Sequence, residues 1–208
     1  MSYTTLKANI VNFMEDDSTE LTASIDVIIA QAEEMVFQKL ANLPCFRNVV
    51  TANLVVNNFD YTVPNARMIR QVSITDSNGN VIYLNHRVDS YLRDYWPKSA
   101  TTGQPIMYST KNAGNSGTVI TLAPTPSATL AYQVDFIAPE AGLSSTNANT
   151  WIDTHAPAVL LAAALYETSA FLKAGETLTL YKAQFDEAAS LFVQEMQRDY
   201  AAEYNGGL

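Results

Sequence analysis

Hydrophobic residues recur at helical spacing at both ends of the chain. Near the start they follow steps of three, four and three residues, at Tyr3, Leu6, Ile10 and Phe13. This period predicts a short amphipathic helix. After the polar segment "EDDSTE", a second helix is predicted from about residue 22 to residue 43, where Pro44 ends it.

Two further helices are predicted in the last third of the chain. Thr154 is placed to cap the first of them, Pro157 lies in its first turn and Gly175 follows its last periodic residue. Its segment "AVLLAAALY" is apolar almost all round, which predicts a buried helix. The final helix is predicted from about Thr177, and its apolar stripe comprises Leu178, Tyr181, Phe185, Ala188, Phe192, Met196, Tyr200 and Tyr204.

The middle of the chain has a different pattern. The segments "VVTANLVV", "MIRQVSIT", "VIYLN", "TVITLA" and "TLAYQVDFI" are short and rich in β-branched and aromatic residues, which favours strands. Residues 76–80 and 112–117 contain the turn signals Asn-Gly and "NAGNSG", which predict tight connections between successive strands. Residues 88–96 are predicted as a short helix and residues 97–105 as a loop.

These patterns predict an α+β fold. Residues 1–45 and 139–208 are expected to form one helical bundle from both chain ends. Residues 46–138 are expected to form an inserted, mostly antiparallel β-rich domain with one short helix. Successive strands without crossover helices suggest a small sandwich or a barrel-like sheet.

Composition narrows the class of protein. The chain has 208 residues, 48% hydrophobic and only 16% charged, which is too apolar for intrinsic disorder. The longest apolar stretch, residues 157–165, is far shorter than the ~20 residues of a membrane span. A single cysteine and the absence of a signal-peptide pattern lead us to expect a soluble protein from a reducing compartment, with no membrane association.

The charge is unevenly distributed. Residues 1–38 carry −6, residues 39–111 carry +4 and residues 112–208 carry −7, which gives the net charge of −9. Binding to duplex DNA requires a dense basic surface, which this balance argues against. An acidic surface would instead suit a channel through which DNA slides.

Candidate chemistry is sparse. His86, His155 and Cys45 are too few for a structural zinc site, and a Cys–His pair for nucleophilic catalysis has no supporting pattern. His155 is expected to make a local polar contact beside a helix cap, and Cys45 to be a small buried residue. The acidic segment after the first helix does not match a calcium loop. We therefore predict no metal and no cofactor.

An enzyme using two carboxylates stays open as an alternative function, for instance a cell-wall hydrolase. The candidate acids are Glu33, Asp135, Glu140 and Asp153. Glycosidases require two carboxyl groups about 5–9 Å apart. A second alternative is a monomeric intracellular binding module.

Several segments together resemble a known family. They are "YTTLKANIVNFMED", "IDVIIAQAEEMVFQKL", "TTGQPIMYST", "GTVITLAPTPSATLAYQVDF", "NTWIDTHAPAVLLAAALYETSAFLK" and "LYKAQFDEAASLFVQEMQRD". The chain resembles the head-to-tail adaptor proteins of tailed bacteriophages, especially those with short tails. The resemblance extends from about Tyr3 to Tyr200.

The resemblance implies a non-enzymatic structural protein of the virion neck, assembled in the host cytoplasm. Such adaptors form a ring, typically of twelve copies, beneath the portal protein. They extend the DNA channel without sequence-specific binding and provide a platform for a tail or nozzle protein below.

Aromatic residues supply the candidate contact sites. The end of the last helix and the tail are predicted to bind the portal, through Met196, Tyr200, Tyr204 and Leu208, because this stripe outruns the preceding helix. The competing explanation is that the first helix covers the stripe. Tail-side or inter-subunit contacts are assigned to Tyr91, Tyr95, Trp96, Asn112 and Asn115, since Tyr and Trp are favoured at interfaces.

Overall fold

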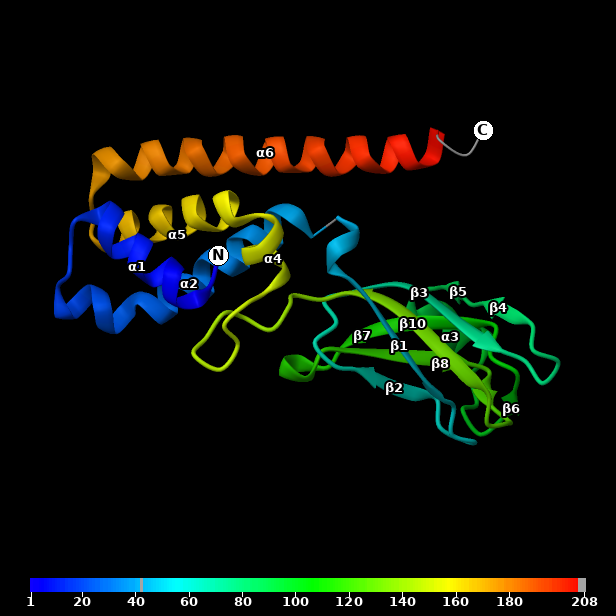
Figure 1. Cartoon of the computed structure of the whole chain (residues 1–208). Helices are drawn as coiled ribbons and strands as arrows, with labels where there is room; N and C mark the ends of the chain where they lie inside the picture. Colours follow the sequence, from blue (N-terminus) through cyan, green and yellow to red (C-terminus); the bar gives the residue numbers. More distant parts are fainter. Residues whose placement is uncertain (42, 206–208) are drawn as a thin grey trace. The chain divides into compact units, whose positions relative to one another are not determined.

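The computed structural model describes residues 1–41 and 43–205. The chain divides into two compact units (Figure 1). Residues 1–45 and 139–208 form the first, here called the helical unit, and residues 46–138 form the second, the β unit. Helices and strands of both kinds are present, and the predicted α+β class is confirmed.

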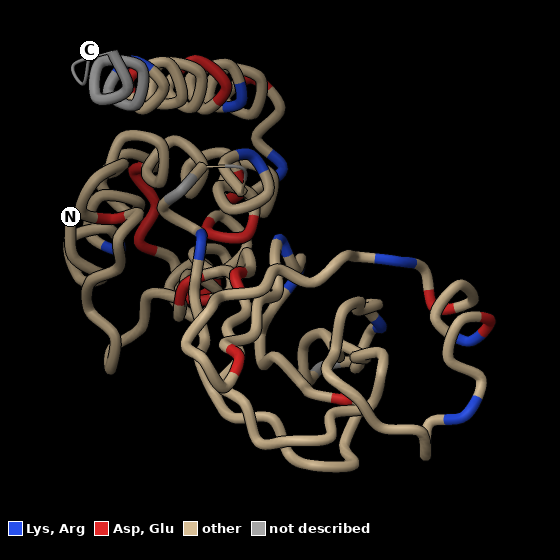
Figure 2. The backbone as a smooth tube through the Cα atoms, turned by 90° about the vertical axis from the view of Figure 1, so that its right-hand side faces the viewer, with Lys and Arg blue, Asp and Glu red and all other residues tan. Residues whose placement is uncertain are grey.

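The two units differ strongly in charge. The helical unit contains five Lys or Arg against sixteen Asp or Glu, a net charge of −11. The β unit contains seven against five, a net charge of +2. In Figure 2 the acidic positions accordingly lie mostly along the helical unit.

The helical unit is built around a central apolar helix. Its helices are α1 (Tyr3–Met14), α2 (Thr19–Leu40), α4 (Trp151–His155), α5 (Pro157–Phe171) and α6 (Gly175–Asn205). A short 3-10 turn, η1 (Pro44–Phe46), leads out of this unit. The other four helices all contact α5. This explains why α5 is apolar almost all round, since only a helix surrounded by neighbours can bury every face.

Side-chain caps set several helix starts. Ser2 and Ser18 cap α1 and α2, so α2 begins at Thr19, three residues before the predicted start. Thr150 caps α4 in a capping box with Asp153. The predicted cap at Thr154 is therefore wrong: its hydroxyl donates to the Thr150 carbonyl at 2.9 Å, inside the short helix.

The connection between α5 and α6 also differs from the prediction. The α5 helix ends at Phe171, and Lys173 takes the left-handed conformation at φ 55°. Gly175 is the first residue of α6, not the residue that terminates α5. The three-residue connection 172–174, with Lys173 in the left-handed conformation, takes the place of the C-terminal glycine that commonly ends a helix.

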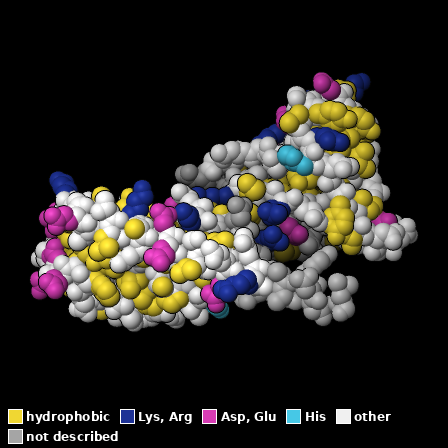
Figure 3. Space-filling model, turned by 90° about the horizontal axis from the view of Figure 1, so that it is seen from above, with side chains coloured by type: hydrophobic (Ala, Val, Ile, Leu, Met, Phe, Trp, Pro, Cys, Tyr) yellow, Lys and Arg dark blue, Asp and Glu magenta, His cyan; other side chains and the backbone are white. Residues whose placement is uncertain are grey.

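Not all apolar side chains of the helical unit are covered. Phe13 and Val27 are exposed on α1 and α2, and Leu180 and Leu191 are exposed on α6. Figure 3 shows hydrophobic side chains at the surface of both units, interspersed with charged ones on the helical unit. Scattered exposed residues of this kind are ordinary on proteins.

The β unit is a sandwich of two four-stranded sheets. The first sheet, here called the outer sheet, has the order β1-β10-β3-β4 and contains β1 (Arg47–Asn53), β10 (Ala131–Ile137), β3 (Met68–Thr75) and β4 (Val81–Tyr83). The second has the order β2-β8-β7-β5 and contains β2 (Asp60–Val63), β8 (Thr118–Ala123), β7 (Met107–Asn112) and β5 (Asn85–His86). Beside them lie α3 (Asp89–Tyr95), the turn η2 (Gly114–Ser116) and the pair β6 (Thr102–Gly103) and β9 (Thr125–Pro126).

The pairing is mostly antiparallel, as the sequence predicted. Two short pairs, β5 with β7 and β6 with β9, are parallel. The turns at residues 76–80 and 112–117 both join antiparallel neighbours. Gly117 has φ 108°, and a side chain there would collide with the backbone at Val63 and Asn65, which requires glycine.

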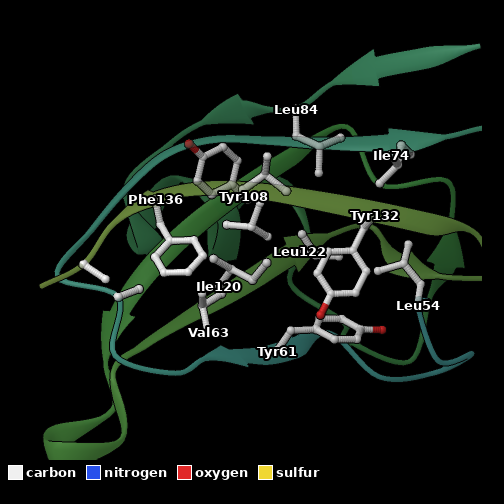
Figure 4. Packing of buried hydrophobic residues seen from close by; sticks show 14 residues of the cluster. Leu54, Tyr61, Val63, Ile74, Leu84, Tyr108, Ile120, Leu122, Tyr132 and Phe136 are labelled. Atoms are coloured by element: carbon white, nitrogen blue, oxygen red, sulfur yellow. The ribbon is translucent and has the colours of Figure 1, made fainter. Parts of the chain in front are cut away.

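The two sheets share one core (Figure 4). Val72, Val134 and Ile120 are fully buried between them, and Tyr61 and Tyr132 meet with ring centroids 5.2 Å apart. The Tyr61 hydroxyl oxygen accepts the Val55 N–H at 2.9 Å, and its single proton lies between the carbonyls of Val55 and Asn58, at 3.1 and 3.0 Å, which fixes the loop after β1. Burial raises the pKa of the Tyr61 phenol.

Candidate interaction surfaces

The short helix α3 and the residue that caps its end present a row of aromatic rings, here called the aromatic row (Tyr91, Tyr95 and Trp96). The rings of Tyr91 and Tyr95 are stacked with their planes 5° apart and their centroids at 6.4 Å, and Tyr95 lies 6.1 Å from Trp96. Arg87 is placed over the Tyr91 ring at 5.6 Å. Tyr91 and Tyr95 are 46% and 50% exposed, so both rings face solvent while held in a fixed order.

Contacts at both ends of α3 hold the aromatic row in place. The Trp96 indole packs beside Leu92, Met107 and Ala123, and its Nε1 donates to the Thr101 carbonyl at 2.7 Å. At the other end of α3, the Asp89 carboxylate lies 3.5 Å from Lys111 Nζ on β7. Trp96 is therefore a packing residue, whereas Tyr91 and Tyr95 are the members available to a partner.

The two asparagines predicted as contacts lie at the β7–β8 turn. The Asn112 side chain is exposed, and its Oδ1 accepts the Gly114 N–H at 2.7 Å. This is a local turn contact. The side chain of Asn115 lies outside the described residues.

The final helix extends well past its partner. With 31 residues, α6 is about 46 Å long, whereas the 15 residues of α5 span about 22 Å. Figure 1 shows α6 running beyond the end of α5. The buried stripe of α6 includes Phe185, Ala189 and Phe192, and the last of these packs edge-on against Trp151 at 6.0 Å.

Beyond Phe192 the side chains of α6 are less buried. Met196 is half-buried, and Gln197 and Arg198 are exposed. Tyr200 and Tyr204 belong to the helical backbone of α6, but their side chains lie outside the described residues, as does Leu208 altogether. The portal contact predicted at these positions stays a prediction.

Three of the four candidate acids act together, but as structural acceptors. Both oxygens of Glu33 accept the Leu143 N–H at 3.0 Å, and Glu140 accepts the Trp151 N–H at 2.7 Å. The fully buried Asp153 accepts the Thr150 N–H at 2.6 Å. All three carboxylates thus fix the connection 139–150 and the start of α4.

The remaining geometry does not favour a two-acid centre. Asp135 belongs to the β unit, where it accepts the Gln133 amide at 2.9 Å. A Cβ atom on Gly142 would lie only 2.9 Å from Glu33 Oε2, so the loop backbone closes directly over this carboxylate. The acids anchor a loop, which is a structural use.

The stability of the helical unit is expected to depend on the protonation of Glu33. Burial raises the pKa of this carboxyl group, the Leu143 N–H lowers it, and the charges of Glu140 and Asp153 raise it further. The folded chain therefore binds the Glu33 proton more tightly than the unfolded chain does, and this stabilises the fold. The stabilisation is fully present below the ordinary pKa of 4.5, and it is lost as the pH rises through the raised pKa of the folded state.

Glu33→Gln keeps an oxygen that can accept the Leu143 N–H but removes the titration. We expect its free energy of unfolding, relative to the wild type, to increase as the pH is raised from 4.5 towards neutrality. Urea unfolding at several pH values measures this, with the exposed Glu187→Gln as the matched control. A constant difference between wild type and Glu33→Gln at every pH would contradict the prediction.

The other candidate ligands are also accounted for locally. His155 stacks on Trp151, with ring centroids 4.7 Å apart, and its Nδ1 lies 3.1 Å from the Trp151 carbonyl, which confirms the predicted local contact. Cys45 is only half-buried. Among the residues whose side chains the structure describes, no group of three or more His, Cys, Asp or Glu is placed to hold a metal ion. No helix within residues 1–41 and 43–205 is long and apolar enough to cross a membrane.

Comparison with protein families identifies the family of the chain. A family model described as SU10 adaptor protein matches residues 1–206. The chain belongs to the SU10 adaptor protein family. A search of curated proteins finds no significant match.

The match confirms the resemblance to phage head-to-tail adaptors. This adaptor is accordingly a structural protein of the phage particle, with its place in the virion neck. The short-tailed type stays a prediction. The match covers residues of both units.

Proposed function

We propose that about twelve copies of this adaptor form a ring beneath the portal protein, extend the DNA channel and provide the platform for a tail or nozzle protein. The observation that carries this proposal is the family match over residues 1–206. We further propose assembly in the host cytoplasm and passage of genomic DNA without sequence-specific binding.

A cyclic ring needs two different, complementary patches on each copy. The chain offers unlike surfaces for this purpose. The helical unit is strongly acidic and carries an overlong helix, whereas the β unit is weakly basic and carries the aromatic row. We propose that the helical and β units are separate domains that use these surfaces towards different partners.

We propose that the channel wall contributed by the ring is acidic or neutral. The net charge of −11 on the helical unit supports this, because a wall of lysines would hold DNA through counterion release. The residues that face the lumen in an image of the complete ring test it. A continuous lining of Lys and Arg would refute the proposal.

We assign the contact with the tail protein, or with the neighbouring copy, to Tyr91 and Tyr95. Truncating both to Ala should leave the melting temperature almost unchanged, because the two rings are about half exposed. Binding of the tail protein to assembled rings should weaken at least about tenfold, since interface tyrosines carry much of the binding energy. Titration of tail protein onto portal–adaptor rings measures this.

The matched control is Met68→Ala, an apolar residue of the β unit that is 56% exposed but lies outside α3 and away from both edge strands. It should retain tail binding. Equal loss for Met68→Ala, or none for the double variant, would place the tail contact elsewhere.

The proposed function as a whole is tested by mixing purified adaptor with portal rings. Mass measurement and electron microscopy should find a ring of adaptor copies, about twelve, attached to one end of the portal. An adaptor that stays monomeric and does not bind the portal would support the binding-module alternative instead.

A further inference from the structure

The outer sheet of the β unit ends in two unpaired strands. Its order is β1-β10-β3-β4, and within the described residues neither β1 nor β4 has a second partner strand in this sheet. The β1 strand is seven residues long, with six of its side chains exposed. Open edges of this kind are templates for pairing with another chain.

The alternation of hydrogen bonds along each strand shows which of its backbone groups point away from the sheet. The Leu54 N–H donates to the Leu130 carbonyl at 2.8 Å, so even-numbered residues of β1 face β10. Alternation along an antiparallel pair turns the odd-numbered residues outward. The outward groups are those of Arg47, Val49, Thr51 and Asn53.

The same reasoning applies to β4. The Leu84 N–H donates to the Val72 carbonyl at 2.9 Å, so the backbone groups of Val81 and Tyr83 face away from β3. In the part of the chain that is described, no hydrogen bond reaches the outward groups of either edge. Both edges therefore present backbone N–H donors and C=O acceptors that another strand could pair with.

Each edge strand carries exposed apolar side chains on the outer face of the sheet. On the outer face of the sheet, Val49 is 60% exposed on β1, and Val81 and Tyr83 are 57% and 64% exposed on β4. The two central strands carry polar side chains on that face, namely Gln71, Ser73, Gln133 and Asp135. At these paired positions, exposed apolar side chains thus lie on the two edge strands and not on the two central strands.

The usual protection of an open edge is missing from β1. Strands at sheet edges commonly carry lysines, a proline or a bulge that blocks further pairing. The segment "RNVVTAN" contains one charged residue, Arg47, and no proline or glycine. Its register with β10 is regular over all seven residues.

Strand direction makes the two edges compatible with each other. All three pairs in the outer sheet are antiparallel, so β1 and β4 run in opposite directions. In a ring of about twelve copies, neighbours are related by a rotation of only about 30°, so their strand directions are nearly the same. The β1 strand of one copy would therefore meet the β4 strand of the next in an antiparallel arrangement.

From these observations we infer that β1 of one copy pairs with β4 of the next, so that the outer sheet continues from copy to copy. This inference rests on the proposed ring and names the contact that closes it. Pairing would bring Val49 beside Val81 or Tyr83, as aromatic and β-branched cross-strand neighbours. Because β4 has only three residues, the junction is short and can accommodate the turn between copies.

Cysteine cross-linking tests the pairing directly. In a Cys45→Ser background, Val49→Cys and Thr51→Cys are each combined with Tyr83→Cys, because two registers place different residues opposite position 83. After oxidation of assembled portal–adaptor rings, at least one double variant should give a ladder of covalent multimers. The matched control, Gln133→Cys with Tyr83→Cys, should give none, since β10 lies one strand further from the neighbour.

A lysine at the edge gives a second measurement. Val49→Lys should raise the adaptor concentration needed for ring formation at least about tenfold, because edge lysines oppose strand addition. Gln71→Lys adds the same charge to a central strand and should assemble like the wild type. Thermal melting of both variants checks that the fold is retained.

The outcomes separate the two proposals. Normal rings from Val49→Lys together with no ladder from either double variant would overturn the strand pairing while leaving the ring intact. Failure of the wild-type chain to form rings on the portal would overturn the proposed function and this inference with it. Ladders confined to the β1–β4 variants would support both.

Discussion

Removal of residues 197–208 should strongly weaken binding of this adaptor to portal rings. The deleted segment is the last part of α6 and the tail, beyond Phe192, where the helix outruns α5. The remaining chain keeps Phe185, Ala189 and Phe192, which carry the packing of α6. We therefore expect its helical content and melting temperature to be retained, while portal affinity falls by at least about 30-fold, as for a lost hot spot of about 2 kcal/mol.

Circular dichroism and a binding titration with portal rings measure the two effects. Tyr200→Ala with Tyr204→Ala narrows the contact, and Leu180→Ala, an exposed leucine near the opposite end of α6, is the matched control. Normal binding by the truncated chain would place the portal contact elsewhere. Unfolding would favour the alternative in which the first helix covers the stripe.

Leu160→Ala should cause the largest loss of stability. Leu160 is fully buried on α5, the helix that the other helices of its unit all contact. Truncation of such a residue costs about 2–5 kcal/mol, because the surrounding helices cannot close the cavity completely. That is a large part of the roughly 5–15 kcal/mol by which proteins of this size are stable.

The effect should be confined to the helical unit, because the β unit has a core of its own. Calorimetry should resolve two transitions, of which Leu160→Ala lowers only one. Leu180→Ala, the same truncation at a position 54% exposed, should shift the transitions very little. A single transition lowered as a whole would show that the two units do not unfold independently.

The strongest local patterns in the sequence predicted the elements well. The period near 3.6 located α1, α2 and α6, and the turn signals at residues 76–80 and 112–117 located two antiparallel connections. These signals work because they reflect the local backbone and one buried face, both of which are encoded within a few residues. The shortest strands, β5, β6 and β9, have only two residues each and no pattern to detect.

The tertiary structure decided the details that depend on distant partners. Thr150 rather than Thr154 became a cap because its reciprocal bond with Asp153 starts a separate five-residue helix before Pro157. The candidate acids became loop anchors because Glu33, on α2, meets Leu143 across 110 residues of sequence. No spacing rule along the chain could indicate that contact.

The candidate interaction surfaces likewise depended partly on the sequence and partly on the tertiary structure. The sequence by itself determined which residues are aromatic, where the apolar stripe of α6 runs and how acidic the two chain ends are, since each is a property of composition and period. Only the tertiary structure decided that Trp96 is a packing residue while Tyr91 and Tyr95 face solvent. Only strand order, in turn, placed Val49 and Tyr83 at opposite free edges of one sheet, because pairing between distant strands determines which edges remain open.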